Sequence, residues 1–143
     1  MTQRFAEGKN YEIDVTGSLA TCRVWSRPDL DSAEGAQLAA EKIAVFQRLS
    51  ASTVQALVLD LSRAPPVTGA KTQESLGAML RAWQDAAKYV AVVAGSNSMQ
   101  QLQLRRIITS FAPDYGKLFD LARQAEEWLT TTRRSKPAAP RPK

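Results

Sequence analysis

The sequence predicts an α/β fold, in which a β-hairpin is followed by βαβ units that build a mixed, mostly parallel sheet of four to five strands with about four helices. Two observations lead to this prediction. Residues 11–24 alternate apolar and polar side chains on both sides of a Gly-Ser pair, which is typical of a hairpin. Beyond them, short apolar runs alternate with segments in which apolar residues recur every three or four positions. Because parallel strands need long crossover connections, this alternation favours helices between the strands.

The hairpin specifies its own register. If Thr16 pairs with Leu19 across a Gly17-Ser18 turn, the apolar side chains of both strands fall on one face. These side chains are Tyr11, Ile13, Val15, Ala20, Cys22 and Val24. In this register Cys22 is a small buried hydrophobe and not a reactive thiol.

Four segments carry a helical pattern of apolar residues. Asp31 followed by Glu34 predicts a capped helix start. The apolar stripe of this helix is Ala36, Ala39, Ile43, Phe46 and Leu49. A second helix has the stripe Leu76, Met79, Leu80, Trp83 and Ala87. A third begins at Ser98 with Gln101, and its stripe is Leu104, Ile107, Ile108 and Phe111. Asp120 is predicted to cap a final helix with Leu121, Ala125, Trp128 and Leu129.

The strands and termini complete the predicted domain organisation. Apolar runs at 56–59 and 89–94 read as strands covered on both faces, and 117–119 reads as a short last strand. Residues 1–10 are predicted to be a polar N-terminal segment, and residues 11–132 a single domain. Residues 133–143 contain three prolines and no apolar pattern, which predicts a disordered basic tail.

The composition argues against an enzyme. The chain of 143 residues contains no histidine and one cysteine, so it has neither a Ser-His-Asp nor a Cys-His arrangement. The same counts leave no Cys/His set for zinc, and no clustered Asp/Glu motif replaces it. We therefore expect a non-enzymatic protein that uses no metal and no cofactor.

Charge and hydropathy limit the classes of partner. The formal net charge is +5, and the tail alone holds five basic residues without an acid, so residues 1–132 are formally neutral. This distribution predicts no specific nucleic-acid binding, only weak contact through the tail. No apolar run approaches the ~18 residues of a membrane span, and the start has no apolar core of a secretory signal. With a single cysteine, a reducing cytoplasm is the expected location.

Three stretches of the chain resemble the STAS family, the fold of bacterial anti-sigma factor antagonists. The first is the strand Leu57-Val58-Leu59-Asp60-Leu61-Ser62. The second is the loop and long helix over 64–83, and the third is Leu118-Phe119-Asp120 leading into the last helix. The resemblance implies a STAS-like fold and a regulatory protein-protein interaction module in bacterial signal transduction. Its partner would be a protein of the kinase-like or switch-regulator type.

The phosphorylation motif of that family is not retained. In the antagonists, the loop after the Asp-Leu-Ser strand carries Asp-Ser-Ser-Gly, and one of its serines is phosphorylated. Here the ungapped position holds Thr68-Gly69-Ala70-Lys71, without either serine. Thr68 and Thr72 are the nearest hydroxyl groups and hence the candidate phosphorylation sites. The alternative role of both threonines is to cap the following helix.

The partner-binding surface is predicted at the loop after this strand. A parallel strand delivers the next loop to the ligand-binding edge of the sheet. The predicted residues are Pro65, Pro66, Thr68, Gly69, Lys71 and Thr72. A nucleoside triphosphate loop is excluded, because the two prolines remove N–H donors and no glycine precedes them at the required spacing. Arg105 and Arg106, on the acid-free polar face of the third helix, are a second candidate docking surface.

A small-molecule or lipid carrier remains the alternative function. Such a protein would hold its ligand in an apolar pocket between the sheet and the helices. A cavity lined by the helix over 76–83 would favour the carrier, whereas a tightly packed core would remove it. The sequence leaves open the identity of the partner and the oligomeric state.

Overall fold

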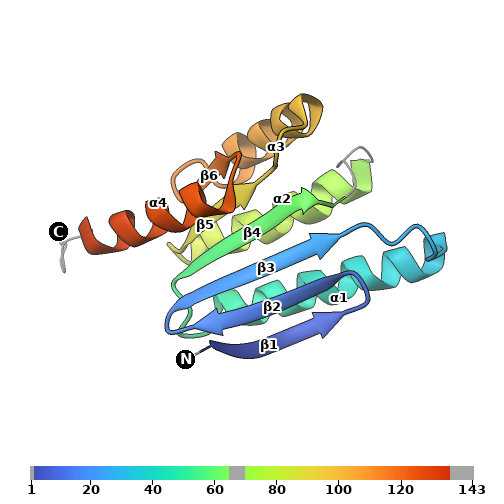
Figure 1. The fold of residues 1–143 in the computed structure, drawn as a ribbon, viewed down its shortest axis with the longest axis horizontal. Coiled ribbons are helices and arrows are strands. Elements are labelled where there is room, and N and C mark those ends of the chain that lie inside the picture. Colours follow the sequence, from blue (N-terminus) through green and yellow to red (C-terminus); the bar gives the residue numbers. More distant parts are fainter. Residues whose placement is uncertain (1, 65–69, 136–143) are drawn as a thin grey trace.

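A mixed sheet, with its strands lying side by side in sequence order, organises the chain (Figure 1). The computed structural model describes residues 2–64 and 70–135, with side chains for 2–64 and 73–132. The six strands of this described part are β1 (Thr2–Gly8), β2 (Tyr11–Thr16), β3 (Leu19–Trp25), β4 (Ala56–Arg63), β5 (Tyr89–Val93) and β6 (Gly116–Phe119). Its four helices are α1 (Ser32–Ser50), α2 (Ala70–Asp85), α3 (Ser98–Phe111) and α4 (Ala122–Ser135). Strands β1 to β3 pair antiparallel and β3 to β6 pair in parallel, which confirms the predicted α/β class.

The hairpin of β2 and β3 has the predicted register. Thr16 pairs with Leu19, and Ile13 pairs with Cys22. Gly17 adopts a φ of 62°, a left-handed conformation that residues with a side chain rarely adopt. This conformation allows the two-residue turn between β2 and β3. Tyr11, Ile13, Ala20, Cys22 and Val24 are buried on one face, and Val15 is half-buried and packs against the same core.

The expectation that residues 1–10 form only a polar segment is wrong, because Thr2–Gly8 is the edge strand β1. This strand raises the number of strands from the expected four to five to six. Its sequence contains only two apolar residues, Phe5 and Ala6, and the register shifts between Arg4 and Ala6. The strand is held by backbone pairing with β2 and by ion pairs of Arg4. Neither interaction produces an apolar pattern in the sequence, so the strand could not be predicted from such a pattern.

The two faces of the sheet are covered unequally. Helices α1, α2 and α3 pack on one face, in a core that includes Phe46, Trp83 and Leu104. On the other face, α4 packs only over the half formed by β4 to β6, with Ala125 and Leu129 against the sheet (Figure 1). The strands β4 and β5 are therefore covered on both faces, as predicted from their continuous apolar runs.

Helix α1 begins as predicted but turns a different side to the sheet. Asp31 caps it in a capping box with Glu34: the Asp31 carboxylate accepts from the Glu34 N–H at 2.8 Å. The predicted apolar stripe is only partly buried, since Ala36 is exposed and Ala39 and Ile43 are half-buried. The side chains that α1 buries are Leu38, Val45, Phe46 and Leu49.

Helix α2 ends at Asp85, so the prediction that Ala87 extends its buried stripe is wrong. Ala87 is exposed and has a φ of 58°, in the left-handed region. The Lys88 N–H donates to the Trp83 carbonyl and the Ala87 N–H donates to the Gln84 carbonyl, both at 3.0 Å. These two bonds form a Schellman motif, in which the left-handed position is normally glycine.

Helix α3 begins at Ser98, as predicted, whereas the start of α4 differs from the prediction. Asn97 caps α3, because its side chain accepts from the Gln100 N–H at 3.0 Å. Asp120 does not directly precede α4, which begins at Ala122, and its carboxylate instead accepts from Gln101 Nε2 at 2.9 Å. Leu121, expected on the buried stripe, is exposed.

The folded domain extends three residues beyond its predicted C-terminal boundary. Helix α4 continues to Ser135, whereas the domain was expected to end at residue 132. The remainder of the predicted basic tail, 136–143, lies outside the described residues. Among the described residues, no helix is long and apolar enough to cross a membrane.

Candidate functional site

An apolar pocket lies between α1 and α2, above the carboxyl-terminal halves of β3 and β4. Its volume is about 350 Å³. The apolar lining includes Val24 and Leu59 from the sheet, Ile43 and Phe46 from α1, and Leu76 and Met79 from α2. Small-molecule sites are typically concave, mostly apolar and about 300–1,000 Å³ in volume, so this pocket is of the right size and character.

The pocket explains why the predicted stripe of α1 is half-exposed. Ala39 and Ile43 line the pocket and are half-buried. Gly35 lies at the exposed end of the same lining, and a Cβ added there would meet no atom within 4 Å. The carrier hypothesis required a cavity lined by the helix over 76–83, and Leu76 and Met79 line this one.

The described lining contains one charged side chain, Lys42. The other polar side chains are those of Asn10 and Ser75, and none of the lining residues is acidic. Lys42 follows Ala39 by three positions and precedes Phe46 by four, so it lies on the apolar stripe of α1. A lysine on a core-facing stripe was the signal in the sequence that could have identified this site, and sequence reasoning passed over it.

The Lys42 ammonium has a neutral hydrogen-bond partner. Its Nζ donates to Asn10 Oδ1 at 3.3 Å and lies 5.7 Å from the centroid of the Tyr11 ring. Within the described residues it forms no ion pair. Burial lowers the pKa of Lys42 below the usual range of lysine, because desolvation disfavours the charged form.

The neighbouring carboxylate on α1 is already engaged. Glu41 accepts a hydrogen bond of 2.8 Å from the hydroxyl of Tyr11, whose ring is buried under the helix. Desolvation, together with this hydrogen bond, raises the pKa of Tyr11 to about 12, so the phenol stays protonated at neutral pH. Glu41 therefore holds the Tyr11 hydroxyl and, like every other carboxylate of the described residues, forms no ion pair with Lys42.

The predicted partner-binding loop adjoins this pocket in sequence. Pro65, Pro66, Thr68 and Gly69 lie outside the described residues. Lys71 and Thr72 are in the first turn of α2, and their side chains are not among those described. The segment is bracketed by Ala64 and Ser75, both of which line the pocket.

The Asp-Leu-Ser end of β4 has a local structural role. Asp60 Oδ1 accepts from the Ser62 N–H at 3.0 Å and from the Ser62 hydroxyl at 2.6 Å. The aspartate side chain thus bonds to the residue two positions later inside β4, where the pairing with β3 shifts register between Arg23 and Trp25.

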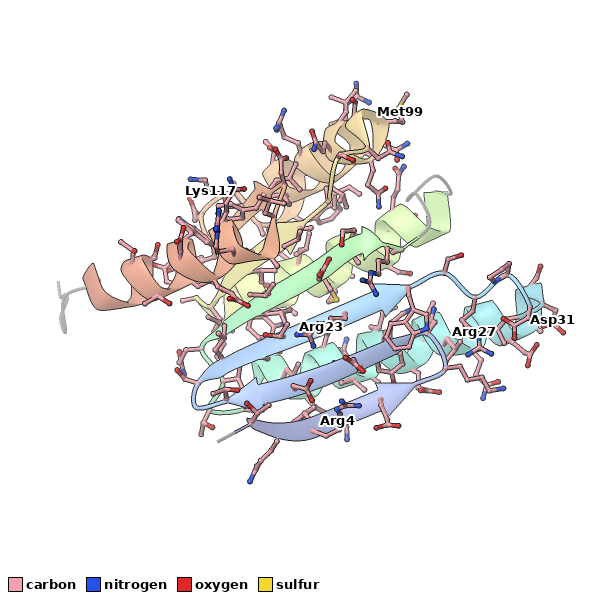
Figure 2. All side chains as sticks on the ribbon, in the orientation of Figure 1. Arg4, Arg23, Arg27, Asp31, Met99 and Lys117 are labelled. Atoms are coloured by element: carbon pink, nitrogen blue, oxygen red, sulfur yellow. The ribbon has the colours of Figure 1, made fainter. Side chains whose placement is uncertain are left out.

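Arg105 and Arg106 are exposed on α3, which contributes no residue to the pocket lining. The structure therefore does not bring the second predicted surface into the pocket. Met99 and Leu102 are also exposed on α3, by 60% and 44%, and Figure 2 shows Met99 at the start of this helix pointing away from the sheet. The α3 face, defined here as Met99, Leu102, Arg105 and Arg106, combines apolar and basic side chains on a helix without acidic residues.

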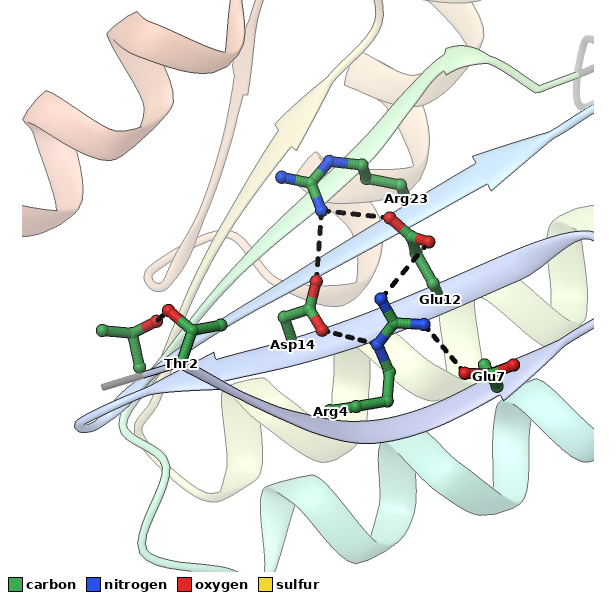
Figure 3. Close-up of polar contacts among 7 residues, drawn as sticks. Thr2, Arg4, Glu7, Glu12, Asp14 and Arg23 are labelled. Atoms are coloured by element: carbon green, nitrogen blue, oxygen red, sulfur yellow. Dashed lines mark hydrogen bonds and ion pairs between the residues drawn. The ribbon is translucent and has the colours of Figure 1, made fainter.

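The open face of β1 to β3 carries a charged network (Figure 3). Arg4 Nε pairs with Asp14 at 2.6 Å, and Arg4 also pairs with Glu7 at 2.9 Å. Arg23 pairs with Glu12 at 3.3 Å and with Asp14 at 3.5 Å. The arginines of this face thus have internal counter-ions, unlike Lys42.

Cys22 and the tryptophans are part of the packing. Cys22 is fully buried, and burial raises the pKa of its thiol to about 12. Trp83 is fully buried in the core, and Trp128 packs edge-on to the Tyr89 ring with the centroids 5.7 Å apart. Among the described residues, no group of three or more His, Cys, Asp or Glu side chains could hold a metal ion.

Comparison with family models, with curated proteins and with solved structures finds no match to this chain. The resemblance to the STAS family therefore remains a prediction from the three stretches of sequence.

Proposed function

We propose that this protein is a non-enzymatic binding domain that holds a small apolar ligand in the pocket between α1 and α2. The observation that carries the proposal is the pocket itself, whose apolar lining includes Ala39, Ile43 and Leu76 as half-buried side chains of two facing helices. Protein cores normally fill such space, because close packing gains dispersion energy and removes apolar surface from water. A half-open apolar volume beside the carboxyl ends of parallel strands is typical of a ligand site.

The chemistry of the lining supports binding over catalysis. Lys42 is its one titratable side chain, so the described lining offers no acid–base pair for proton transfer. The chain has no histidine, and its one thiol is buried with a raised pKa. A binding role needs only apolar contact and one orienting group.

The test is to fill the pocket from its exposed end. In Gly35→Leu the new side chain enters open space, and replacing a helical glycine stabilises α1 by about 0.5–1 kcal/mol. We expect the neutral dye N-phenylnaphthylamine to bind the wild-type chain with increased fluorescence and to bind Gly35→Leu at least tenfold more weakly. Ala36→Leu is the matched control, because Ala36 is exposed on the same turn and does not line the pocket.

The result is decisive in both directions. Binding that is lost in Gly35→Leu and kept in Ala36→Leu places the ligand in the pocket. Equal dye binding by both variants, or no binding by the wild-type chain, contradicts the proposal. Thermal unfolding of each variant checks that the fold is intact.

A second candidate function is the regulatory protein-protein interaction module implied by the STAS resemblance, and the α3 face favours it. Exposed apolar side chains next to arginines are typical of interaction surfaces. Because α3 has no acidic residue, the partner would present acidic and apolar side chains together. In this proposal the partner is a kinase-like or switch regulator of a bacterial cytoplasm. Phosphorylation of Thr68 or Thr72 would add negative charge near the start of α2 and regulate the contact.

Charge reversal on α3 tests this second candidate. The double substitution Arg105→Glu with Arg106→Glu is expected to abolish retention of a protein partner in affinity capture from the native cytoplasm. Arg123→Glu, on the exposed side of α4, is the control and should retain the partner. Unchanged retention by the α3 variant contradicts a role of this face.

A further inference from the structure

We infer that the ligand of the α1–α2 pocket is an apolar monocarboxylate whose acid group binds the Lys42 ammonium. This inference rests on the proposed function, since it assigns a ligand class to the same pocket. It follows from three features of the pocket: the single charge of the lining, the absence of an internal counter-ion, and the position of that charge relative to the apolar wall.

The first feature is the sign of the charge in the pocket lining. Among the described lining residues the one charged side chain is a cation, and the others are apolar apart from Asn10 and Ser75. A neutral apolar ligand would leave the ammonium unpaired and remove still more water from it, which is unfavourable. A ligand with one negative group would pair with the ammonium and bury its apolar body in the same step.

The second feature is the exclusion of internal carboxylates. Glu41, next to Lys42 on α1, is held by the hydroxyl of Tyr11 at 2.8 Å. Glu34, about two turns before Lys42 on α1, pairs with Lys9 at 3.5 Å and closes the capping box. The one polar partner of Lys42 among the described residues is the neutral side chain of Asn10. Burial lowers the pKa of Lys42, and the charge of Glu41 opposes that shift only in part.

Other cations of the fold differ from Lys42 in having a carboxylate partner. Arg4 and Arg23 are exposed, yet each has a carboxylate within 3.5 Å. Lys42 is half-buried and has no carboxylate at ion-pair distance among the described residues. A counter-ion stabilises a half-buried cation more than an exposed cation, because water screens the attraction between the two charges less in a partly buried site.

The third feature is the orientation that the lining imposes. Lys42 and Asn10 are joined by a hydrogen bond of 3.3 Å, so the ammonium and the amide lie together on the α1 side, and Ser75 is the one polar residue of α2 in the described lining. Leu76 and Met79 form the apolar wall on the α2 side. The acid group of the ligand therefore lies at Lys42, and its apolar part extends toward α2. One ammonium matches the single charge of a carboxylate, whereas a phosphate dianion normally takes several donors.

The experiment compares an acid and an alcohol of the same chain length on the full chain. Decanoate and decanol are titrated at pH 7 by isothermal calorimetry against the wild-type chain, Lys42→Met and Lys117→Met. We expect the wild-type chain to bind decanoate about ten- to one-hundredfold more tightly than decanol, as a charge-assisted hydrogen bond in a partly buried site provides. In Lys42→Met that preference disappears, while the affinity for decanol stays within about twofold. Lys117→Met removes an equivalent ammonium from β6, outside the pocket, and keeps the preference.

The outcomes separate this inference from the function on which it rests. If both probes bind and the wild-type chain shows no preference for the acid, or if Lys42→Met keeps that preference, the ligand class is wrong and the pocket remains a binding site. If neither probe binds and the neutral dye also fails to bind, the proposed function falls together with the inference. Lys42→Gln serves as a second variant, so that the conclusion does not depend on the folding of one substitution.

Discussion

At the scale of single residues, burial decides which chemical groups of this chain can react. Cys22 is fully enclosed by the sheet and α1, and its thiol pKa is raised to about 12. The reactive thiolate is then about one part in ten thousand at pH 8. We expect Ellman's reagent to leave the native protein unmodified at pH 8 and to modify one thiol per chain in guanidinium chloride. Fast modification of the native protein would show that Cys22 is accessible.

A second prediction at the scale of single residues concerns the effect of Lys42 on stability. In the ligand-free protein a half-buried ammonium without a counter-ion costs stability, so Lys42→Met should raise the free energy of unfolding by about 1 kcal/mol at pH 7. Chemical denaturation with urea measures this difference. A loss of stability in Lys42→Met would contradict the unpaired state of the ammonium.

The pH dependence of that difference has a definite sign. The folded-state pKa of Lys42 lies below its unfolded value, so the folded protein releases its proton first. The stability of the wild-type chain therefore rises, relative to Lys42→Met, as the pH increases from the folded-state pKa toward the unfolded value of about 10.4. The gain from Lys42→Met is expected to be largest near pH 7 and to shrink as the pH approaches 10.

At the scale of helices and strands, the end of α2 gives a prediction about backbone strain. Ala87 occupies the left-handed position of a Schellman motif, with a φ of 58°. A side chain in this conformation costs roughly 1 kcal/mol, which glycine avoids. We expect Ala87→Gly to raise the free energy of unfolding by about 1 kcal/mol. Ala86→Gly, one residue earlier on the same exposed turn, is the control and should not stabilise the protein.

The elements that sequence reasoning predicted well are those whose information is local. The register of β2 and β3 follows from the alternation of Tyr11 to Val24 and from the requirement of the turn for Gly17. The capping box of α1 likewise depends on two residues three positions apart, Asp31 and Glu34. In both cases the pattern and the structure contain the same short-range geometry, so the prediction succeeds.

The elements that sequence reasoning missed depend on distant partners. Strand β1 has little apolar pattern of its own. It forms because its backbone pairs with β2 and because Arg4 pairs with Asp14 on that strand. Ala39 and Ile43 line a pocket together with residues of α2, and the packing of two helices in space cannot be predicted from a local sequence pattern. For the same reason the pocket could be named as a hypothesis from the sequence, but Lys42 could not be assigned to it.

At the scale of the whole molecule, the unequal cover of the sheet predicts a gradient of local stability. Strands β4 and β5 are covered by helices on both faces, whereas β1 is an edge strand with mostly exposed side chains. Amide hydrogen exchange should be slowest in β4 and β5 and at least about a hundredfold faster in β1. Comparable protection of β1 and β4 would show that the sheet opens only as one cooperative unit.

The placement of the chain ends has a practical consequence. Thr2 begins β1 opposite Thr16, at the hairpin-turn end of the sheet, and α4 runs back toward that same end (Figure 1). The pocket is at the opposite end, beside Val24 and Leu61 near the ends of β3 and β4. Either end of the described chain can therefore be tethered to a sensor surface, a fluorescent reporter or a neighbouring domain, with the ligand entrance left facing the solution.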